Sequence, residues 1–140
     1  MMCDDITAKV AELLGDISKA GGYKTDCGSA VRDQLAVDPD ARDLPCINVD
    51  YEDVELPEDA DGGIVGMVLM IEIFSRPQMK VSDIVTDAMK VLKKNKDLDG
   101  LAAEFYPLGS RKVSEQGQYR INYALLRFRV YYPTADAWEF

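Results

Sequence analysis

The stretch YRINYALLRFRVYY, residues 119–132, has the clearest strand pattern in the chain. One parity carries Ala124, Leu126, Phe128, Val130 and Tyr132. The other parity carries Tyr123, Leu125, Arg127, Arg129 and Tyr131. Successive side chains of a strand point to opposite faces of a sheet. The stretch therefore predicts a long strand with its first set of residues toward a core.

Three other segments have the composition of strands. Residues 46–51 alternate between two faces, and residues 102–112 are a weaker candidate. Residues 64–74 are apolar on both parities apart from one glycine and one glutamate, which is typical of a strand covered on both faces. The expected hairpin connections are residues 51–63 and 113–118.

Two segments repeat apolar residues at helical spacing. The first covers residues 4–19, with Asp4 or Asp5 expected as its cap and a pair of glycines after its end. The second covers residues 81–92 and is followed by lysines, which suit the negative end of a helix dipole. The predicted order along the chain is therefore helix, strands, helix, strands.

This order predicts a single α+β domain over residues 1–140, with two helices packed on one face of a mainly antiparallel four- to five-stranded sheet. Residues 134–140 are expected to form a short flexible C-terminal tail. Two helices cover only one face of such a sheet. Because the second face is also rich in apolar residues, a neighbouring copy of the chain is the economical candidate for covering it.

An acidic segment at residues 50–62 interrupts the apolar strands. It contains seven acids and no base, so we expect a solvated hairpin loop. Oxygen ligands of this kind could bind calcium or magnesium, but their spacing does not match an EF-hand loop. The acids are Asp50, Glu52, Asp53, Glu55, Glu58, Asp59 and Asp61.

Composition argues against several function classes. The chain has 140 residues, a formal charge of −9 and no histidine, so neither attraction to nucleic acid nor histidine-based catalysis is expected. Its three cysteines are expected to be free thiols, and Cys27 has no histidine to activate it. No signal peptide or membrane span is expected. We therefore predict no catalytic residue, no metal ligand and no cofactor.

Arg127 and Arg129 alternate with apolar residues on the second face of the last strand. They could pair with carboxylates of a partner chain, because arginine is favoured at interfaces. Alternatively, their stems cover the exposed sheet and their charged ends remain in water. The sequence favours neither reading.

Several motifs together suggest a family. The first helix closes in AGGYKTDCG, residues 20–28, and the next strand begins LPCINV, residues 44–49. LDGL at residues 98–101 and YYP at residues 131–133 follow the second helix. In this arrangement the chain resembles the tail-terminator, or tail-completion, family of long-tailed bacteriophages and prophages, of the minor tail protein U kind. The residues that carry the pattern are Gly22, Tyr23, Thr25, Asp26, Gly28, Leu44 and Pro45.

The resemblance implies a non-enzymatic virion protein that forms a homo-oligomeric ring, commonly a hexamer. Such a ring caps the tail-tube protein, ends tube polymerisation and joins the tail to neck proteins of the head. It implies a place in the virion tail, with the host cytoplasm as the site of assembly and DNA passing through the channel without specific binding. A neck or head-completion protein of the same particle is the alternative. From another class, a small metal-dependent hydrolase or a calcium-binding module stays open.

Overall fold

The computed structural model describes residues 1–32, 44–115 and 121–140. No helix in these ranges is both long enough and apolar enough to cross a membrane. The described elements, in chain order, are α1 (Met2–Leu14), η1 (Lys19–Gly21), η2 (Cys27–Ala30), β1 (Val31–Arg32), β2 (Cys46–Glu55), β3 (Gly63–Ser75), α2 (Val81–Lys93), β4 (Glu104–Glu115) and β5 (Ile121–Thr134).

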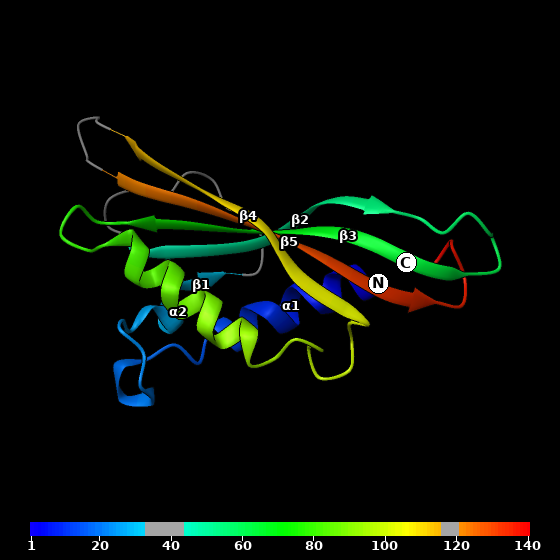
Figure 1. Ribbon diagram of the computed structural model, residues 1–140, viewed down its shortest axis with the longest axis horizontal. Coiled ribbons are helices and arrows are strands. Elements are labelled where there is room, and N and C mark those ends of the chain that lie inside the picture. The colour runs from blue at the N-terminus through cyan, green and yellow to red at the C-terminus, as the bar shows by residue number, and fades with distance from the viewer. Residues whose placement is uncertain (33–43, 116–120) are drawn as a thin grey trace.

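The strands form one mixed sheet in the order β1-β2-β3-β5-β4 (Figure 1). The short β1 runs parallel to β2, and every other pairing is antiparallel. The long β3 and β5 lie at the centre and pair along their whole lengths. The predicted α+β class and the mainly antiparallel sheet are therefore confirmed.

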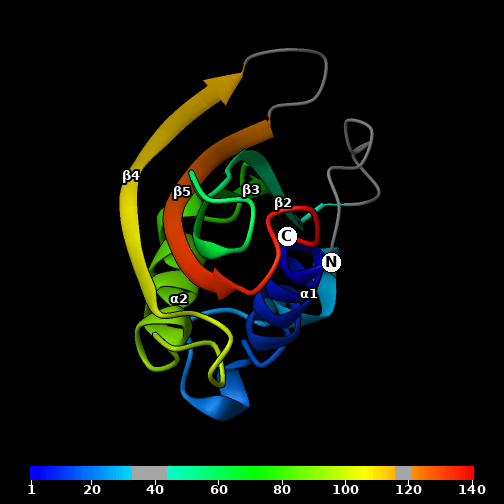
Figure 2. The same ribbon diagram turned by 90° about the vertical axis from the view of Figure 1, so that its right-hand side faces the viewer.

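Both helices lie on the same side of the sheet, which curls around them (Figure 2). We call this side the concave face and the opposite side the convex face. Concave-face residues of the central strands, such as Leu69, Ile71 and Phe128, are almost fully buried. They form one hydrophobic cluster with residues of both helices, including Ile6 and Ile84. Burial of this cluster is the main source of stability.

The first helix is shorter than its pattern predicts. It begins after Met1, which makes no side-chain cap, and it ends at Leu14. Ile17 is nevertheless buried, because the chain turns after the helix and still follows the core. The apolar spacing therefore continued past the helix and made the predicted end wrong. Gly22 adopts a left-handed φ of 92° at the end of η1 instead.

The acidic segment is largely a strand, so the prediction of a solvated loop over residues 50–62 is wrong in its first half. β2 continues to Glu55 and pairs with β3, with an irregularity in register between Tyr51 and Asp53. The ladder satisfies the backbone groups, and Val54 is only partly exposed. Hydrogen bonding with β3 thus overrides the repulsion between neighbouring acids.

The C-terminal segment is docked against the fold, in contrast to the predicted flexible tail. Thr134 still belongs to β5. The carbonyl of Phe140 accepts hydrogen bonds from the Cys3 amide at 3.2 Å and from the Tyr132 hydroxyl at 2.9 Å. The Ala137 amide donates to the Ala60 carbonyl at 3.3 Å. The last residues therefore bridge α1 and the β2–β3 turn.

The other strand predictions are close to the structure. β5 spans Ile121–Thr134, two residues later than predicted, and β4 spans Glu104–Glu115, which begins two residues and ends three residues later than predicted. The prediction of a turn at residues 113–118 is wrong in its first half, because β4 continues to Glu115, and residues 116–118 lie outside the described residues. β1 was not predicted, because two residues carry no periodic signal.

Candidate functional site

The convex face carries the candidate interface residues of β5. Tyr123, Leu125, Arg129 and Tyr131 are partly exposed there, and Arg127 is exposed. Their neighbours of the opposite parity are buried on the concave face. The structure thus places all five predicted residues in one row. Whether they contact a partner stays a prediction.

Arg127 is paired within its own chain. Its Nε donates to Glu52 Oε1 at 2.6 Å, and the two charged groups form a salt bridge. Glu52 lies at the irregularity in β2, which directs its side chain across the sheet. Sequence reasoning placed Glu52 in a loop and so missed this pair. Neither reading of Arg127 anticipated a carboxylate of the same chain.

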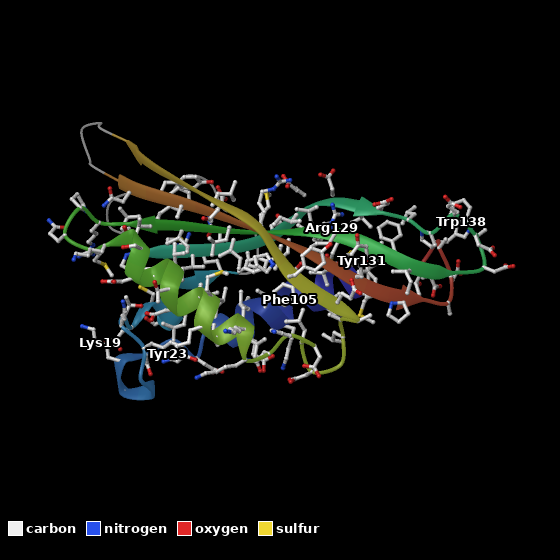
Figure 3. The ribbon with its side chains drawn as sticks, in the orientation of Figure 1. Lys19, Tyr23, Phe105, Arg129, Tyr131 and Trp138 are labelled. Atoms are coloured by element: carbon white, nitrogen blue, oxygen red, sulfur yellow. The ribbon has the colours of Figure 1, made fainter. Side chains whose placement is uncertain are left out.

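Arg129 lies over the sheet and close to the Tyr131 ring. Its guanidinium carbon is 5.9 Å from the ring centroid (Figure 3). Across the ladder it faces Val68, which is only 3% exposed although no described helix covers this face. The arrangement matches an arginine stem that covers apolar surface.

Aromatic contacts stiffen both ends of the row. The Tyr123 hydroxyl donates to Glu72 at 2.9 Å, and its ring lies 5.0 Å from that of Phe74. At the other end the Tyr131 ring lies over Gly66, where a Cβ would come within 3.0 Å of it. The glycine that interrupts the apolar pattern of β3 therefore makes room for Tyr131.

β4 extends the convex face by two residues that sequence reasoning missed. Tyr106 is 42% exposed and Leu108 is 45% exposed. The Tyr106 ring lies 6.4 Å from that of Tyr131, and a hydrogen bond between their side chains raises the pKa of Tyr106. The alternation of β4 could have predicted Tyr106. The register shift between Pro107 and Gly109 obscured Leu108.

One residue of the family pattern, Thr25, binds a buried carboxylate, Asp87 of α2. Asp87 is 1% exposed and accepts hydrogen bonds from the amides of Lys24 and Thr25, both at 2.9 Å, and from the Thr25 hydroxyl at 2.7 Å. Sequence reasoning missed Asp87. Its position on the apolar stripe of the helix was the available signal. These hydrogen bonds hold the loop that follows α1 against α2.

The remaining pattern residues also serve the backbone. The carboxylate of Asp26 accepts from the Lys19 amide at 2.8 Å. A Cβ on Gly28 would lie 2.4 Å from the Gly15 carbonyl, so only glycine fits there. Tyr23 lies beneath Lys90, with the Nζ atom 4.9 Å from the ring centroid. These contacts give the motif a structural role.

The 44–45 part of the pattern leads into β2. The peptide bond between Leu44 and Pro45 is cis, and Leu44 is 4% exposed. The Arg76 Nε donates to the Leu44 carbonyl at 2.8 Å. This contact ties the entry of β2 to the end of β3.

A polar cleft of about 550 Å³ lies beside this motif. Its lining includes three lysines, together with Asp26 and Asp83, so the charges nearly balance. Cys27 also lines the cleft, and burial raises the pKa of its thiol. A protonated thiol is a poor nucleophile at neutral pH. All three cysteines are buried.

The end of the sheet forms a second candidate surface. We call it the acidic tip: residues 55–64, which connect β2 to β3, and the C-terminal residues 135–140 packed on them. Its exposed apolar side chains are Trp138 at 83%, Ile64 at 54% and Leu56 at 46%. In the described part of the chain, no group of three acid, cysteine or histidine side chains is placed to hold a metal ion. The exposed acids here include Glu55, Glu58, Asp59 and Asp61.

A third surface is an apolar groove of about 500 Å³ between α2 and β4, which we call the helix–strand groove. Phe105 and Phe128 stack in it with their ring centroids 5.0 Å apart. Leu92, Met89 and Pro107 complete its apolar lining, while the polar lining includes Lys90, Lys93 and Lys96.

The comparisons with known proteins do not identify a function, so the functional argument rests on the residues and surfaces described above. No protein-family model matches the chain, and no curated protein sequence matches it.

Proposed function

We propose that this chain is a structural protein of a long-tailed bacteriophage or prophage, a tail-terminator subunit. Copies of it form a ring, commonly a hexamer, that caps the tail tube. The ring ends polymerisation of the tube protein and offers a surface to the neck proteins. The proposal rests on the resemblance of the sequence and on one structural observation, that no described helix covers the convex face.

The convex face suits contact with a flat protein surface. Both described helices pack on the concave side, so Tyr106 of β4 and Tyr131 of β5 stay at least partly accessible on the convex side. Tyrosine and arginine are enriched at protein interfaces, because they combine a broad apolar surface with hydrogen-bonding ends. Pairs such as Arg127 with Glu52 hold these side chains in place before a partner arrives.

Charge supports the role of a ring around a DNA channel. Each subunit carries a formal charge of −9, so a ring presents a strongly negative interior wherever its acids face the channel. Such a wall repels the phosphate backbone and lets DNA pass without specific binding. Assembly would take place in the host cytoplasm and end with the protein in the virion tail.

The test is electron microscopy of the purified protein, alone and mixed with tail tubes of the same phage, with light scattering for mass. We expect rings, or caps at tube ends. Particles that bind the connector of the head and ignore tubes would support a neck protein instead. A monodisperse monomer that binds neither structure would refute the proposal.

A specific variant sharpens the test. Leu108→Ser with Leu125→Ser makes the convex face more polar while the concave core and the helix–strand groove stay intact. If that face meets the tube or the neighbouring subunit, the variant folds but caps fewer tubes. As a matched control, Ala8→Ser with Ala103→Ser changes two exposed residues away from the convex row and should cap normally.

A further inference from the structure

The acidic tip and the helix–strand groove have complementary chemistry and lie apart on the molecule. The tip is at one end of the long axis, where Trp138 projects, whereas Phe105 of the groove lies near the middle (Figure 3). A single copy therefore exposes both surfaces. Two copies could join them.

Charge is segregated between the two surfaces. Residues 49–75 and 130–140, which include the whole tip, contain no lysine or arginine. Residues 88–96, which form one wall of the groove, contain four lysines and no acid. Lys93 and Lys96 are exposed at the groove and make no ion pair with any described residue. Opposite charges of this kind orient partners as they meet.

Apolar side chains match as well. Trp138 is the only tryptophan of the chain and is 83% exposed, next to the exposed Leu56 and Ile64 of the same tip. Exposed tryptophan is costly in water and is frequent at the centre of interfaces. The groove, at about 500 Å³, has room for an indole ring together with a branched side chain. Its lysines could also lie over the face of the indole.

Hydrogen bonds and close packing fix the conformation of the acidic tip. Within its turn, the Asp61 amide donates to Asp59 Oδ1 at 2.9 Å. The Trp138 amide donates to Asp136 Oδ1, also at 2.9 Å. Gly62 fits so closely under the C-terminal segment that a Cβ would lie 2.4 Å from the Thr134 carbonyl. An ordered tip loses little conformational freedom when it docks.

We infer that the acidic tip of one copy, with Trp138 as its anchor, docks into the helix–strand groove of the next copy. The contact joins two different surfaces, so it propagates from copy to copy and closes into a ring when the rotation permits. The inference deepens the proposed function, on which it rests, because it names the subunit contact of the ring.

Charge reversal provides the test. One variant carries Glu55→Lys with Glu58→Lys at the tip, and the other carries Lys93→Glu with Lys96→Glu at the groove. A control carries Asp5→Lys with Asp16→Lys, which changes the net charge as much as the tip variant but lies outside both surfaces. Sedimentation equilibrium at low salt, from micromolar to millimolar protein, gives the association constant. The emission of Trp138 reports its burial.

We expect the wild-type chain to associate with a blue shift of tryptophan emission, and the control to behave alike. Each reversed variant alone should associate more weakly by at least about tenfold, because like charges then face each other. An equimolar mixture of the two variants should regain association, since each lysine tip meets a glutamate groove and each glutamate tip meets a lysine groove.

Other outcomes separate this inference from the proposed function. Association that both variants retain, or Trp138 emission unchanged in the assembled form, overturns the docking while a ring can stand. A blue-shifted particle of two copies supports the docking and contradicts a ring. Absence of association in the wild type and in the mixture overturns the docking, and caps on tube ends then test the function separately.

Discussion

The two faces of the central strands are stabilised by different interactions. On the concave face, residues such as Leu69 and Phe128 are buried by packing alone. On the convex face, the same strands carry side chains held by polar pairs, such as Arg127 with Glu52 and Tyr123 with Glu72. Packing gives the first face its stability. The pairs give the second face a fixed shape while leaving it available for contact.

Truncating one side chain on each face should give the largest difference in stability between the two faces. Leu69→Ala removes a fully buried side chain and should lower the free energy of unfolding by about 4 kcal/mol. Met70→Ala, its neighbour on the convex face, is partly exposed and should cost about 1 kcal/mol. Urea denaturation measures both. Equal losses would show that the convex face is as tightly packed as the concave face.

The second prediction concerns Asp87, the one buried carboxylate among the residues that the structure describes. Asp87→Ala leaves the buried amide and hydroxyl of Thr25 without their acceptor, so we expect a loss of about 3 kcal/mol. Asp83→Ala on the same helix removes only a long contact with Lys24, at 3.7 Å, and should cost less than about 1 kcal/mol. Thermal or urea unfolding of both variants provides the measurement. A loss at Asp87 no larger than at Asp83 would contradict a structural role for the cluster.

These two predictions mark what the sequence could and could not show. Period-2 alternation predicted β5 and both of its faces, because every second residue changes from apolar to polar or aromatic. The Glu52–Arg127 pair depends on a strand irregularity 75 positions away in sequence, which no local pattern reveals. Asp87 was hidden because its partners are backbone groups of a distant loop. The docking of the C-terminal segment was missed because it depends on backbone groups, the Phe140 carbonyl and the Ala137 amide, which leave no pattern in the sequence.

A smaller effect is expected at alkaline pH, where a tyrosine at the edge of the core ionises. A hydrogen bond with Cys3, nearby charge and burial raise the pKa of Tyr51 from 10.0 to about 12. Because the folded chain favours the neutral phenol, its stabilising contribution is complete below pH 10 and is lost as the pH rises through about 12. Burial likewise raises the pKa of Tyr132. Stability measured across this range should fall, and Tyr51→Phe should flatten the fall.

The smallest effect should come from the convex-face ion pair. A double-mutant cycle of Glu52→Gln and Arg127→Gln should give a coupling below about 1 kcal/mol, because both side chains are partly exposed and water screens their attraction. The same variants should bind tail tubes more weakly than this stability change explains. A large coupling in stability, with unchanged tube binding, would make the pair purely structural.

The most direct measurement of the central claim is the length of tails assembled with and without this protein. Electron micrographs of tails formed by the remaining tail proteins of the phage, before and after the chain is added, provide the distribution. A tail terminator predicts overgrown or uncapped tubes in its absence, and uniform tubes with a ring at one end when it is present. Tubes of the same length and bare ends under both conditions would contradict the account.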